Sequence, residues 1–483
     1  MQQNNQISLF GGVDRVAVLL YLLLVATGLL CITSVSFEEP EITEFFSFSR
    51  FHIKQAIWAA AASVVAIVIL LLDSRYFHMY AYYAYALGVL LIFGTIVLPE
   101  SIAPTFNGAK AWYSFGSFAV QPVEFTKITV ALAVARLMSN YDYSIRKIGD
   151  MAHVAAIILL PLAIIILQND TGSGVVLCSF IIVLYREGLN NWICIPLIMV
   201  ATLFIFSFLF TPLILLLVLV LLFTLSSAMM VGRWRTHIVF VAGVLLAAML
   251  LYTVGEVIGW DLSGYNALVI CSLAGAALAA VYAIRKNLTP IFLSLLFFIG
   301  SMVFVPTADK IFESVLQPHQ KERILSFLGI VNDPKGADYN VTQAKIAIGS
   351  GGLVGKGFMQ GTQNRYFVPE KETDFIFTTV GEEWGFVGSA VVLTLLCAMI
   401  LRLMKMGERQ QEPFSRIYCY CVASVLLFHV MVNVGMNVGL MPVMGIPLPF
   451  LSYGGSSLVA FTILVFIAIR LDASPTKGLS ALQ

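Results

Sequence analysis

The chain has 483 residues, of which 59% are hydrophobic and only 11% are charged. A soluble domain carries about 25% charged residues, so this composition excludes an ordinary water-soluble fold. The formal net charge of +1 gives no electrostatic reason to expect nucleic acid as a partner.

Apolar runs recur along the whole sequence, and each is long enough to cross a bilayer core of about 30 Å as a helix. We therefore predict an all-α, polytopic transmembrane bundle with about fourteen spans. Acidic residues, and no small-residue cleavage site, follow the first span, so we expect a retained helix rather than a signal peptide. The predicted spans cover residues 16–36, 53–72, 76–98, 122–138, 152–168, 171–186, 192–209, 212–231, 238–254, 266–284, 290–306, 375–402, 415–440 and 456–471.

The placement of lysine and arginine predicts how the chain crosses the membrane. With a cytoplasmic N-terminus, every basic short loop falls inside, as the positive-inside rule requires. The C-terminus is then cytoplasmic too, and the long polar segment 307–374 is a large extracytoplasmic loop. Loops of this length are usually functional, so we expect the site outside the membrane. The basic loops are residues 73–75, 146–147, 186, 232–235, 285–286 and 402–409.

One membrane domain over residues 1–483 is the simplest organisation, because the sequence shows neither a repeat of fixed period nor a low-complexity linker. The seven cysteines lie in apolar segments and include no CxxC pair. Disulfides and structural zinc are therefore not expected.

The first candidate site lies at the start of the predicted helix 122–138. Glu124 and Lys127 are three residues apart and share one helix face. A charged pair at the edge of the bilayer is costly, which indicates a functional site, although a structural ion pair fits as well. Lys110 and Trp112, in the preceding connection, fit substrate binding and interfacial anchoring equally.

The second candidate is Asp170, which lies between two spans at the predicted outer surface. Its carboxylate could bind a cation or a substrate hydroxyl. Capping of the next helix explains the same position, and on the sequence alone we favour capping.

The third candidate is the glycine-rich stretch 349–363, which contains Lys356. Glycines with a lysine are typical of a phosphate cradle, because bare backbone N–H groups can approach oxygen closely. The pattern is not a P-loop, since Ser350 and Gly357 occupy two positions that the motif specifies otherwise. A flexible loop is the alternative interpretation.

The fourth candidate is Asp374, where the polar segment re-enters an apolar run. A carboxylate at such a boundary can be partly desolvated and act as a base, while helix capping is again the alternative. Glu382 and Glu383 follow inside the same apolar run and require polar partners there. Further on, the prolines and glycines of 445–457 exclude a regular helix, and irregular backbone at membrane depth indicates the wall of a cleft.

Three strings carry a resemblance to a known family: GAKAW…QPVEFTK at 108–127, VTQAKIAIGSGGLVGKGFMQGTQ…VPEKETDFIF at 341–377, and GIPLPFLSYGGSS at 445–457. In this order they resemble the SEDS family (shape, elongation, division and sporulation), most closely its cell-elongation branch. The resemblance covers the first six predicted helices and the chain after 306.

The resemblance implies a peptidoglycan glycosyltransferase of cell elongation and shape, which uses lipid II as donor and acceptor and releases undecaprenyl pyrophosphate. It implies Asp374 as the base that deprotonates the acceptor hydroxyl. Glu124 and Lys127 match the family's intramembrane pair, and Asp170 matches its aspartate after the fifth helix. The cations that we expect to bind the diphosphate are Lys110, Lys127, Arg323, Lys356 and Arg365.

By the same resemblance, the protein lies in the bacterial cytoplasmic membrane with an extracytoplasmic active site. Its implied partners are a class B penicillin-binding protein (a transpeptidase), lipid II, membrane lipids and other cell-elongation proteins. No cofactor is certain; a divalent cation, Mg²⁺ or Mn²⁺, could act with Asp170 or Glu124, although the sequence contains no recognisable metal motif.

The sequence departs from the family pattern in several places. Val123, Asn169 and Ala111 replace a serine, a proline and an arginine that are usual there, and the last change leaves Lys110 as the nearest cation for a pyrophosphate. We expect residues 190–285 to add four inserted helices to the family's usual ten. A partner-binding surface is our only suggestion for them.

Two other classes of function compete with a polymerase. A flippase or transporter for lipid-linked sugars also uses charged pairs and broken helices inside the membrane. The second competing class is an inactive scaffold that recruits a synthase. Within the family, a division-type polymerase is the alternative to the elongation type.

Overall fold

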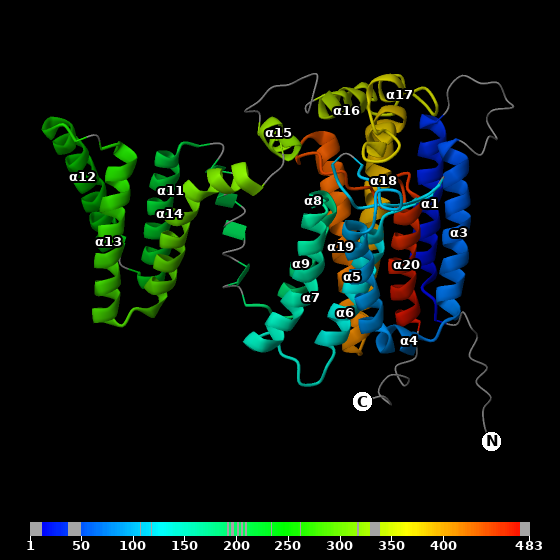
Figure 1. The fold of residues 1–483 in the computed structure, drawn as a ribbon, viewed down its shortest axis with the longest axis horizontal. Coiled ribbons are helices and arrows are strands. Elements are labelled where there is room, and N and C mark those ends of the chain that lie inside the picture. Colours follow the sequence, from blue (N-terminus) through cyan, green and yellow to red (C-terminus); the bar gives the residue numbers. More distant parts are fainter. Residues whose placement is uncertain are drawn as a thin grey trace. The chain divides into compact units, whose positions relative to one another are not determined.

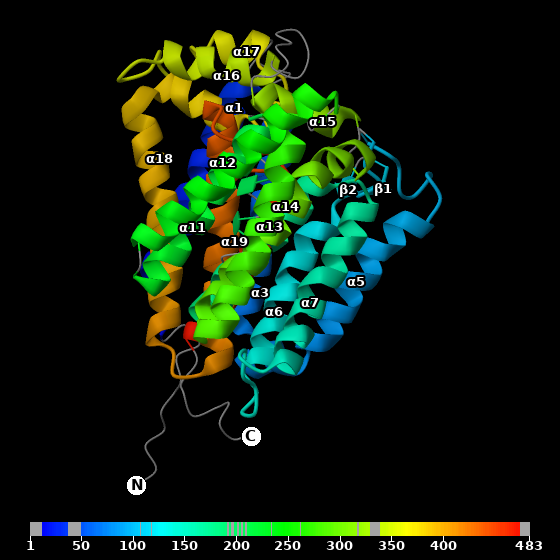
Figure 2. The ribbon, with the colours of Figure 1, turned by 90° about the vertical axis from the view of Figure 1, so that its left-hand side faces the viewer.

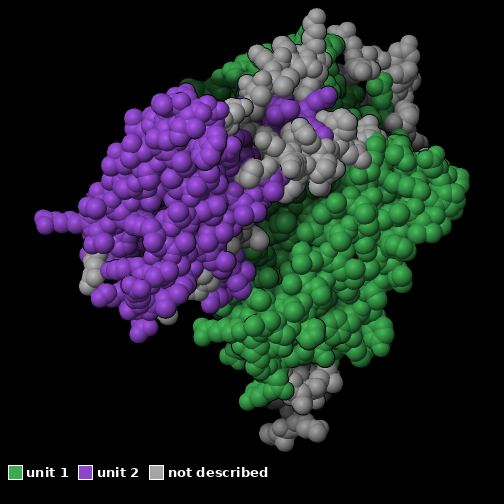
Figure 3. Space-filling view, turned by 60° about the vertical axis from the view of Figure 1, so that its left-hand side comes forward, with its two compact units in different colours: residues 1–189, 333–483 green, residues 190–332 purple. Residues whose placement is uncertain are grey.

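The computed structural model describes residues 12–36, 50–106, 108–116, 118–190, 193–194, 198–199, 202–203, 206–207, 210–232, 234–260, 262–315, 318–328 and 339–473. The chain divides into two compact units (Figure 3). Unit 1 comprises residues 1–189 and 333–483, and unit 2 comprises residues 190–332.

Unit 1 is helical, with one small β-hairpin. Strand β1 (Tyr113–Phe115) pairs antiparallel with β2 (Phe118–Val120), and Tyr113 faces Val120. Its helices are α1 (Arg15–Val35), α3 (Phe51–Leu71), α4 (Ser74–Met79), α5 (Ala81–Val97), α6 (Pro122–Met138), α7 (Ile148–Leu167), α8 (Thr171–Leu177), α9 (Phe180–Arg186), α16 (Tyr339–Ser350), α17 (Gln363–Phe367), α18 (Ile376–Arg409), α19 (Pro413–Val438) and α20 (Gly455–Asp472).

Unit 2 consists of α11 (Pro212–Val231), α12 (Trp234–Ile258), α13 (Gly264–Lys286), α14 (Thr289–Val315) and α15 (Pro318–Phe327). Short connections join successive helices, and left-handed residues end two of them: Gly232 after α11 and Asn287 after α13. This is the usual way to stop a helix, because the left-handed residue turns the chain away from the axis. The unit has an apolar core of its own, to which α11 contributes Leu215 and α14 contributes Leu295.

In the part of the chain that the structure describes, nine helices are long and apolar enough to cross a membrane. They are α1, α3, α7, α11, α12, α13, α18, α19 and α20. The protein is therefore a multi-pass membrane protein. Helices also occupy the other predicted spans except 192–209, most of which lies outside the described residues. The total of about fourteen spans stays a prediction.

The helices of unit 1 run between two ends of the bundle. Helices α16 and α17 lie at one end, and the short α4 lies at the other (Figures 1 and 2). Helix α19 is central, because it packs against α6, α9, α16, α18 and α20. In the most apolar 18-residue stretch of α19, 78% of the residues are buried, compared with 33% in the corresponding stretch of α1. The core of unit 1 thus lies around α19.

The segment 307–374, predicted as a loop, is partly helical. It contains the end of α14, all of α15 in unit 2, and α16 and α17 in unit 1. Helix α16 is stable in this position because Ala344 and Ala347 are buried against Phe375. The predicted insertion 190–285 begins where unit 2 begins, but unit 2 continues to residue 332.

Candidate functional site

Asp374 stands immediately before α18, at the end of unit 1 where α16 and α17 lie. Its side chain is only partly exposed, and the next residue, Phe375, is buried. Asn433 donates a hydrogen bond to the Asp374 carbonyl oxygen at 2.9 Å, and Asn437 donates to the same oxygen at 3.2 Å. The backbone that carries the carboxylate is therefore fixed by helix α19.

Residues 439–454, which we call the irregular segment, connect α19 to α20 without regular structure. The segment binds the chain just before Asp374: Ser452 Oγ donates to the Thr373 carbonyl oxygen at 2.6 Å, and the Tyr453 N–H donates to the Glu372 carbonyl oxygen at 2.7 Å. Gly445, with φ of +68°, lies beside the Asp374 carboxylate. The irregular segment thus forms one wall next to the candidate base.

A polar stripe on α19 connects this wall to the membrane interior. His429, Asn433 and Asn437 are spaced by four residues, lie on one helix face and are at most 1% exposed. Asn433 also donates to the Ile446 carbonyl oxygen at 2.8 Å, and His429 Nδ1 lies 3.0 Å from the Pro447 carbonyl oxygen. The stripe therefore holds both Asp374 and the irregular segment.

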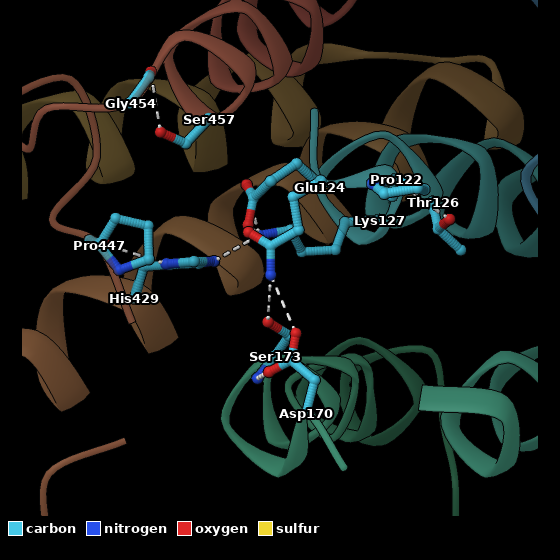
Figure 4. Close-up of polar contacts among 11 residues, drawn as sticks. Pro122, Glu124, Thr126, Lys127, Asp170, Ser173, His429, Pro447, Gly454 and Ser457 are labelled. Carbon is cyan, nitrogen blue, oxygen red and sulfur yellow. Dashed lines mark hydrogen bonds and ion pairs between the residues drawn. The ribbon is translucent and has the colours of Figure 1, made fainter. Parts of the chain in front are cut away.

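Glu124 and Lys127 form the predicted ion pair, and Figure 4 shows them beside His429. Lys127 Nζ lies 2.8 Å from both Glu124 carboxylate oxygens and 2.9 Å from His429 Nε2. Both side chains of the pair are buried, at 2% and 1% exposure. Pro122 opens α6 and Glu124 lies in its first turn, where a carboxylate complements the helix dipole.

Asp170 caps helix α8, as the sequence favoured. Its Oδ1 accepts from the Ser173 N–H at 3.2 Å, and its Oδ2 accepts from Gln121 Nε2 at 2.9 Å (Figure 4). Helix α8 meets the irregular segment at Gly172, where a Cβ would lie 2.0 Å from the Met444 carbonyl oxygen. The motif around Asp170 therefore packs against the same wall as Asp374.

Lys110 closes the end of a helix. Its ammonium donates to the carbonyl oxygens of Ile96 at 3.2 Å and Leu98 at 2.7 Å. These are terminal carbonyl groups of α5, which attract a cation. Trp112 is partly buried in the connection that follows.

The glycine-rich stretch fills a break in α18. Gly385 has φ of +65° and interrupts the helix, and the chain at 351–357 lies in the gap. The Lys356 and Gly357 N–H groups donate to the Glu382 and Glu383 carbonyl oxygens at 3.0 and 2.9 Å. On the other side of the break, the Phe386 N–H donates to the Gly352 carbonyl oxygen at 2.9 Å. These glycines thus permit close backbone packing, and the bonded amides are not available to a phosphate.

The Glu382 carboxylate organises the residues after the glycines. It accepts from the backbone N–H groups of Thr362 at 3.0 Å, Gln363 at 2.8 Å and Asn364 at 2.6 Å, and it forms an ion pair with Lys356. The neighbouring Glu383 accepts from Ser34 of α1. Both carboxylates therefore have the polar partners that their burial requires.

Two other predicted cations are placed differently. Arg365 lies in α17 and donates to the Met359 carbonyl oxygen at 2.9 Å. Arg323 belongs to α15 in unit 2, and its side chain lies outside the described residues. The structure thus brings Lys356 and Arg365 to the same end of unit 1 as Asp374. The role of each predicted site residue stays a prediction.

Sequence reasoning missed the polar stripe and two cations near the wall. The sequence did contain a signal for His429, Asn433 and Asn437, because these three polar residues recur every four positions in an apolar helix. Lys345 of α16 lies against Gly439, at the beginning of the irregular segment. Lys54 stands one residue before Gln55 of α3, whose amide contacts Ser452 and Gly454. Among the described residues, no group of three His, Cys, Asp or Glu side chains could hold a metal ion.

The fold and the site together define a multi-pass membrane protein with a polar site at one end of its helical core. Residues 14–221 and 210–477 match the model of the FtsW, RodA and SpoVE family, described as cell cycle protein. The chain therefore belongs to this family, which is the SEDS family.

Curated relatives agree with this assignment. Over 466 residues the chain is 30% identical to the peptidoglycan glycosyltransferase RodA of Treponema pallidum. The match covers 95% of this chain and 97% of that protein. The chain is 27% identical over 402 residues to the peptidoglycan glycosyltransferase MrdB of Escherichia coli. This match covers 83% of this chain and 80% of that protein.

Solved structures share the fold. The crystal structure of the rod shape determining protein RodA of Thermus thermophilus has a TM-score of 0.53 at 21% identity, over 95% of this chain and 96% of that one. A chain from a peptidoglycan synthase complex, described in terms of coordinated polymerization and crosslinking, has a TM-score of 0.58 at 22% identity. This match covers 95% of this chain and 98% of that one.

Proposed function

We propose that this protein is a peptidoglycan glycosyltransferase that polymerises lipid II during cell elongation and determines cell shape. The names of its relatives and its membership of the family support this function. The structural observation that carries it is the placement of Asp374: a partly exposed carboxylate whose backbone is fixed from two sides, by Asn433 and by the irregular segment.

The chemistry needs a base and a stabilised leaving group. The acceptor sugar hydroxyl oxygen forms a bond to the anomeric carbon of the donor, and the bond from that carbon to the diphosphate breaks. Asp374 takes the hydroxyl proton, which is general-base catalysis. Undecaprenyl pyrophosphate leaves with the bonding electron pair, and nearby cations stabilise its charge.

Cations at this end of unit 1 are suited to the diphosphate. Lys345 and Lys54 belong to helices that contact the irregular segment, and Lys356 and Arg365 lie in the chain between α16 and Asp374. Lys127, Lys110, Lys356 and Arg365 already donate to protein oxygens. We therefore expect these four to hold the protein around the site, and Lys345 and Lys54 to attract the substrate.

No step is assigned to a metal ion. Lys127 binds both oxygens of Glu124, while Gln121 and the Ser173 N–H bind the oxygens of Asp170. These two carboxylates, the candidates for a Mg²⁺ or Mn²⁺ site, are thus occupied by donors from the protein.

The proposed orientation places both termini in the cytoplasm and Asp374 outside, in the bacterial cytoplasmic membrane. Arg146 and Lys147 lie in the connection between α6 and α7, and Arg186 is the last residue of α9. The α6–α7 connection lies at the end of unit 1 opposite to α16 and α17 (Figure 1). This arrangement agrees with the positive-inside rule. The polyprenyl tail of the substrate stays in the bilayer while its sugars reach the site.

A class B penicillin-binding protein is the proposed partner, because a polymerase that faces outward supplies strands to a transpeptidase. A solved relative of the same fold belongs to a peptidoglycan synthase complex, which supports this pairing.

The test is to reconstitute the purified protein with its cognate transpeptidase, supply lipid II, and separate the glycan strands on a gel. We expect polymer from the wild type and almost none from Asp374→Ala, with equal expression. Glu100→Gln, which changes an exposed carboxylate of the loop after α5, is the matched control and should polymerise normally. If no variant makes polymer and fluorescent lipid II crosses the membrane instead, the protein is a flippase.

A further inference from the structure

Unit 2 contains a cavity of about 270 Å³ between α11, α12, α13 and α14. Its walls include Thr224 and Ser227 of α11, His237 and Phe240 of α12, and Ala279 and Tyr282 of α13. All of these residues lie in the last two turns of α11 and α13 or the first two turns of α12. The cavity therefore lies at the end of the unit where the α12–α13 hairpin begins and ends.

The interior of the cavity is apolar despite its hydroxyl groups. Thr224 Oγ1 donates to the Val220 carbonyl oxygen at 2.5 Å, and Ser227 Oγ donates to the Thr224 carbonyl oxygen at 3.1 Å, so both hydroxyls bond within their own helix. Further from this end, α12 and α13 approach closely at Gly275, where a Cβ would lie 2.8 Å from Val244 Cγ2. This contact narrows the space between the two helices beyond the cavity.

The volume of the cavity suits one acyl chain rather than a whole ligand. Sites for complete drug-sized ligands measure roughly 300–1,000 Å³ and carry a few convergent polar groups. This cavity is smaller than that range and mostly apolar. An acyl chain could enter it while the remainder of the molecule stays at the membrane surface.

Three basic residues lie at the same end of unit 2 as the cavity. Arg235 lies in the first turn of α12, and Arg285 and Lys286 lie in the last turn of α13, and all three are exposed. The sequence contains no Asp or Glu between residues 188 and 255 or between 262 and 308. Within the described residues, none of the three cations takes part in an ion pair. Trp234, 47% exposed at the same end, is a typical residue of the membrane interface.

We propose that unit 2 binds an anionic glycerophospholipid at this site, with one acyl chain in the cavity and the phosphate at Arg235, Arg285 and Lys286. Basic residues at the membrane surface attract anionic headgroups, and the adjoining cavity adds a specific place for the chain. In the proposed orientation the lipid comes from the cytoplasmic leaflet. This site is separate from the Asp374 site and would give the inserted helices a lipid-sensing or anchoring role.

The test uses native mass spectrometry of the full-length protein in detergent, with phosphatidylglycerol or phosphatidylcholine added. We expect one phosphatidylglycerol to be retained in preference to phosphatidylcholine. The triple variant Arg235→Gln/Arg285→Gln/Lys286→Gln should lose affinity about a hundredfold, since each cation near an anionic headgroup contributes about fivefold. Arg146→Gln/Lys147→Gln, which removes cations from a loop of unit 1, should change nothing.

A second variant tests the cavity without altering the charges. Ala279→Phe fills the space and should abolish preferential retention, whereas Ala247→Phe, at an exposed position of α12, should retain the lipid. A monodisperse elution profile shows that each variant is folded, and Ser227→Leu replaces Ala279→Phe if the latter is not. Equal retention of the two phospholipids, wild-type behaviour of the filled variant, or tighter retention of undecaprenyl phosphate would overturn the proposal.

Discussion

Lys127 has three N–H donors, and the fold uses all of them. Two point at Glu124 and the third at His429, which in turn contacts the Pro447 carbonyl oxygen. The pair is thus linked to the irregular segment through one histidine. Of the two interpretations that the sequence allowed, the geometry favours a pair that positions the wall of the site.

Removal of one partner should be costly. Lys127→Met leaves the Glu124 carboxylate buried without its counter-charge, so we expect the free energy of unfolding to fall by about 3–5 kcal/mol and polymerisation to fall with it. The double variant Glu124→Gln/Lys127→Met should recover much of the stability. Thermal unfolding in detergent and the lipid II assay measure the two effects. Lys147→Met, at an exposed lysine, serves as control, and wild-type stability of Lys127→Met would contradict this role.

At this scale the sequence predicted partners along one helix but not partners between helices. The spacing of Glu124 and Lys127 on α6 predicted their contact, which the structure confirms. His429 belongs to α19, three hundred positions later, and only the fold brings it to Lys127. The contacts of the glycine-rich stretch were out of reach for a similar reason: the Lys356 and Gly357 amides bond to the broken helix α18, and the break at Gly385 was not predicted.

The irregular segment is the element that connects the motifs. It contacts α3 through Gln55, α8 through Gly172, α19 through Asn433, and the chain beside Asp374 through Ser452. Its prolines and glycines predicted that residues 445–454 are not helical, and the structure confirms this. Helix α20 begins at Gly455, within the stretch that was predicted to be irregular.

A substitution at Gly172 tests how closely α8 must approach the irregular segment. A Cβ at this position would lie 2.0 Å from the Met444 carbonyl oxygen, a backbone atom that cannot rotate away. We expect Gly172→Ala to lower the unfolding temperature and to reduce polymerisation, because it displaces the irregular segment. Gly174→Ala in the same helix meets flexible side chains of Leu162 and Ile165 and should have a small effect. Equal effects of the two variants would argue against the close packing.

Across the whole molecule, the first and last helices are joined at the end opposite to Asp374. Asp14, which caps α1, accepts from Arg402 Nε at 2.9 Å and from Arg409 Nη2 at 2.8 Å, and Arg409 Nε also donates to Asp472 at 2.7 Å. Burial alone would raise the pKa of Asp14, but the hydrogen bonds from Arg402, the Ala17 N–H and Arg409 outweigh it and hold the pKa below its ordinary value.

A lowered pKa in the folded state means that the ionised Asp14 stabilises the fold. This stabilisation is complete above the unfolded pKa of about 3.9 and is lost as the pH falls through the lower folded pKa. We expect Asp14→Asn to cost about 2 kcal/mol at pH 7, since hydrogen bonds to charged groups contribute about that much. The difference in unfolding temperature between wild type and variant should stay constant from pH 7 to about pH 4 and should shrink only below this pH. Asp142→Asn, in an exposed loop, should follow the wild type throughout.

The orientation of the whole molecule can be tested by labelling. Tyr366 of α17 is 71% exposed and Tyr141, in the loop after α6, is 95% exposed, at opposite ends of unit 1. In intact cells, a membrane-impermeant maleimide should label Tyr366→Cys in a cysteine-free background. It should label Tyr141→Cys only after permeabilisation. The reverse pattern would place Asp374 in the cytoplasm and exclude the proposed function.

The sequence predicted the membrane class and the positions of most helices, because apolar runs and basic loops are local signals. It could not predict that 190–332 forms a separate unit, because this depends on which helices bury their faces together. It also could not show which carboxylates find donors, since those donors come from other elements.

The most direct test of the account is the rate of lipid II consumption in a single turnover by Asp374→Asn, measured together with lipid II binding. The variant keeps the shape and the backbone hydrogen bonds and removes only the base. We predict unchanged lipid II affinity and a rate that is lower by about 10²–10⁴-fold, the usual contribution of a general base. A rate equal to that of the wild type would show that another group takes the proton.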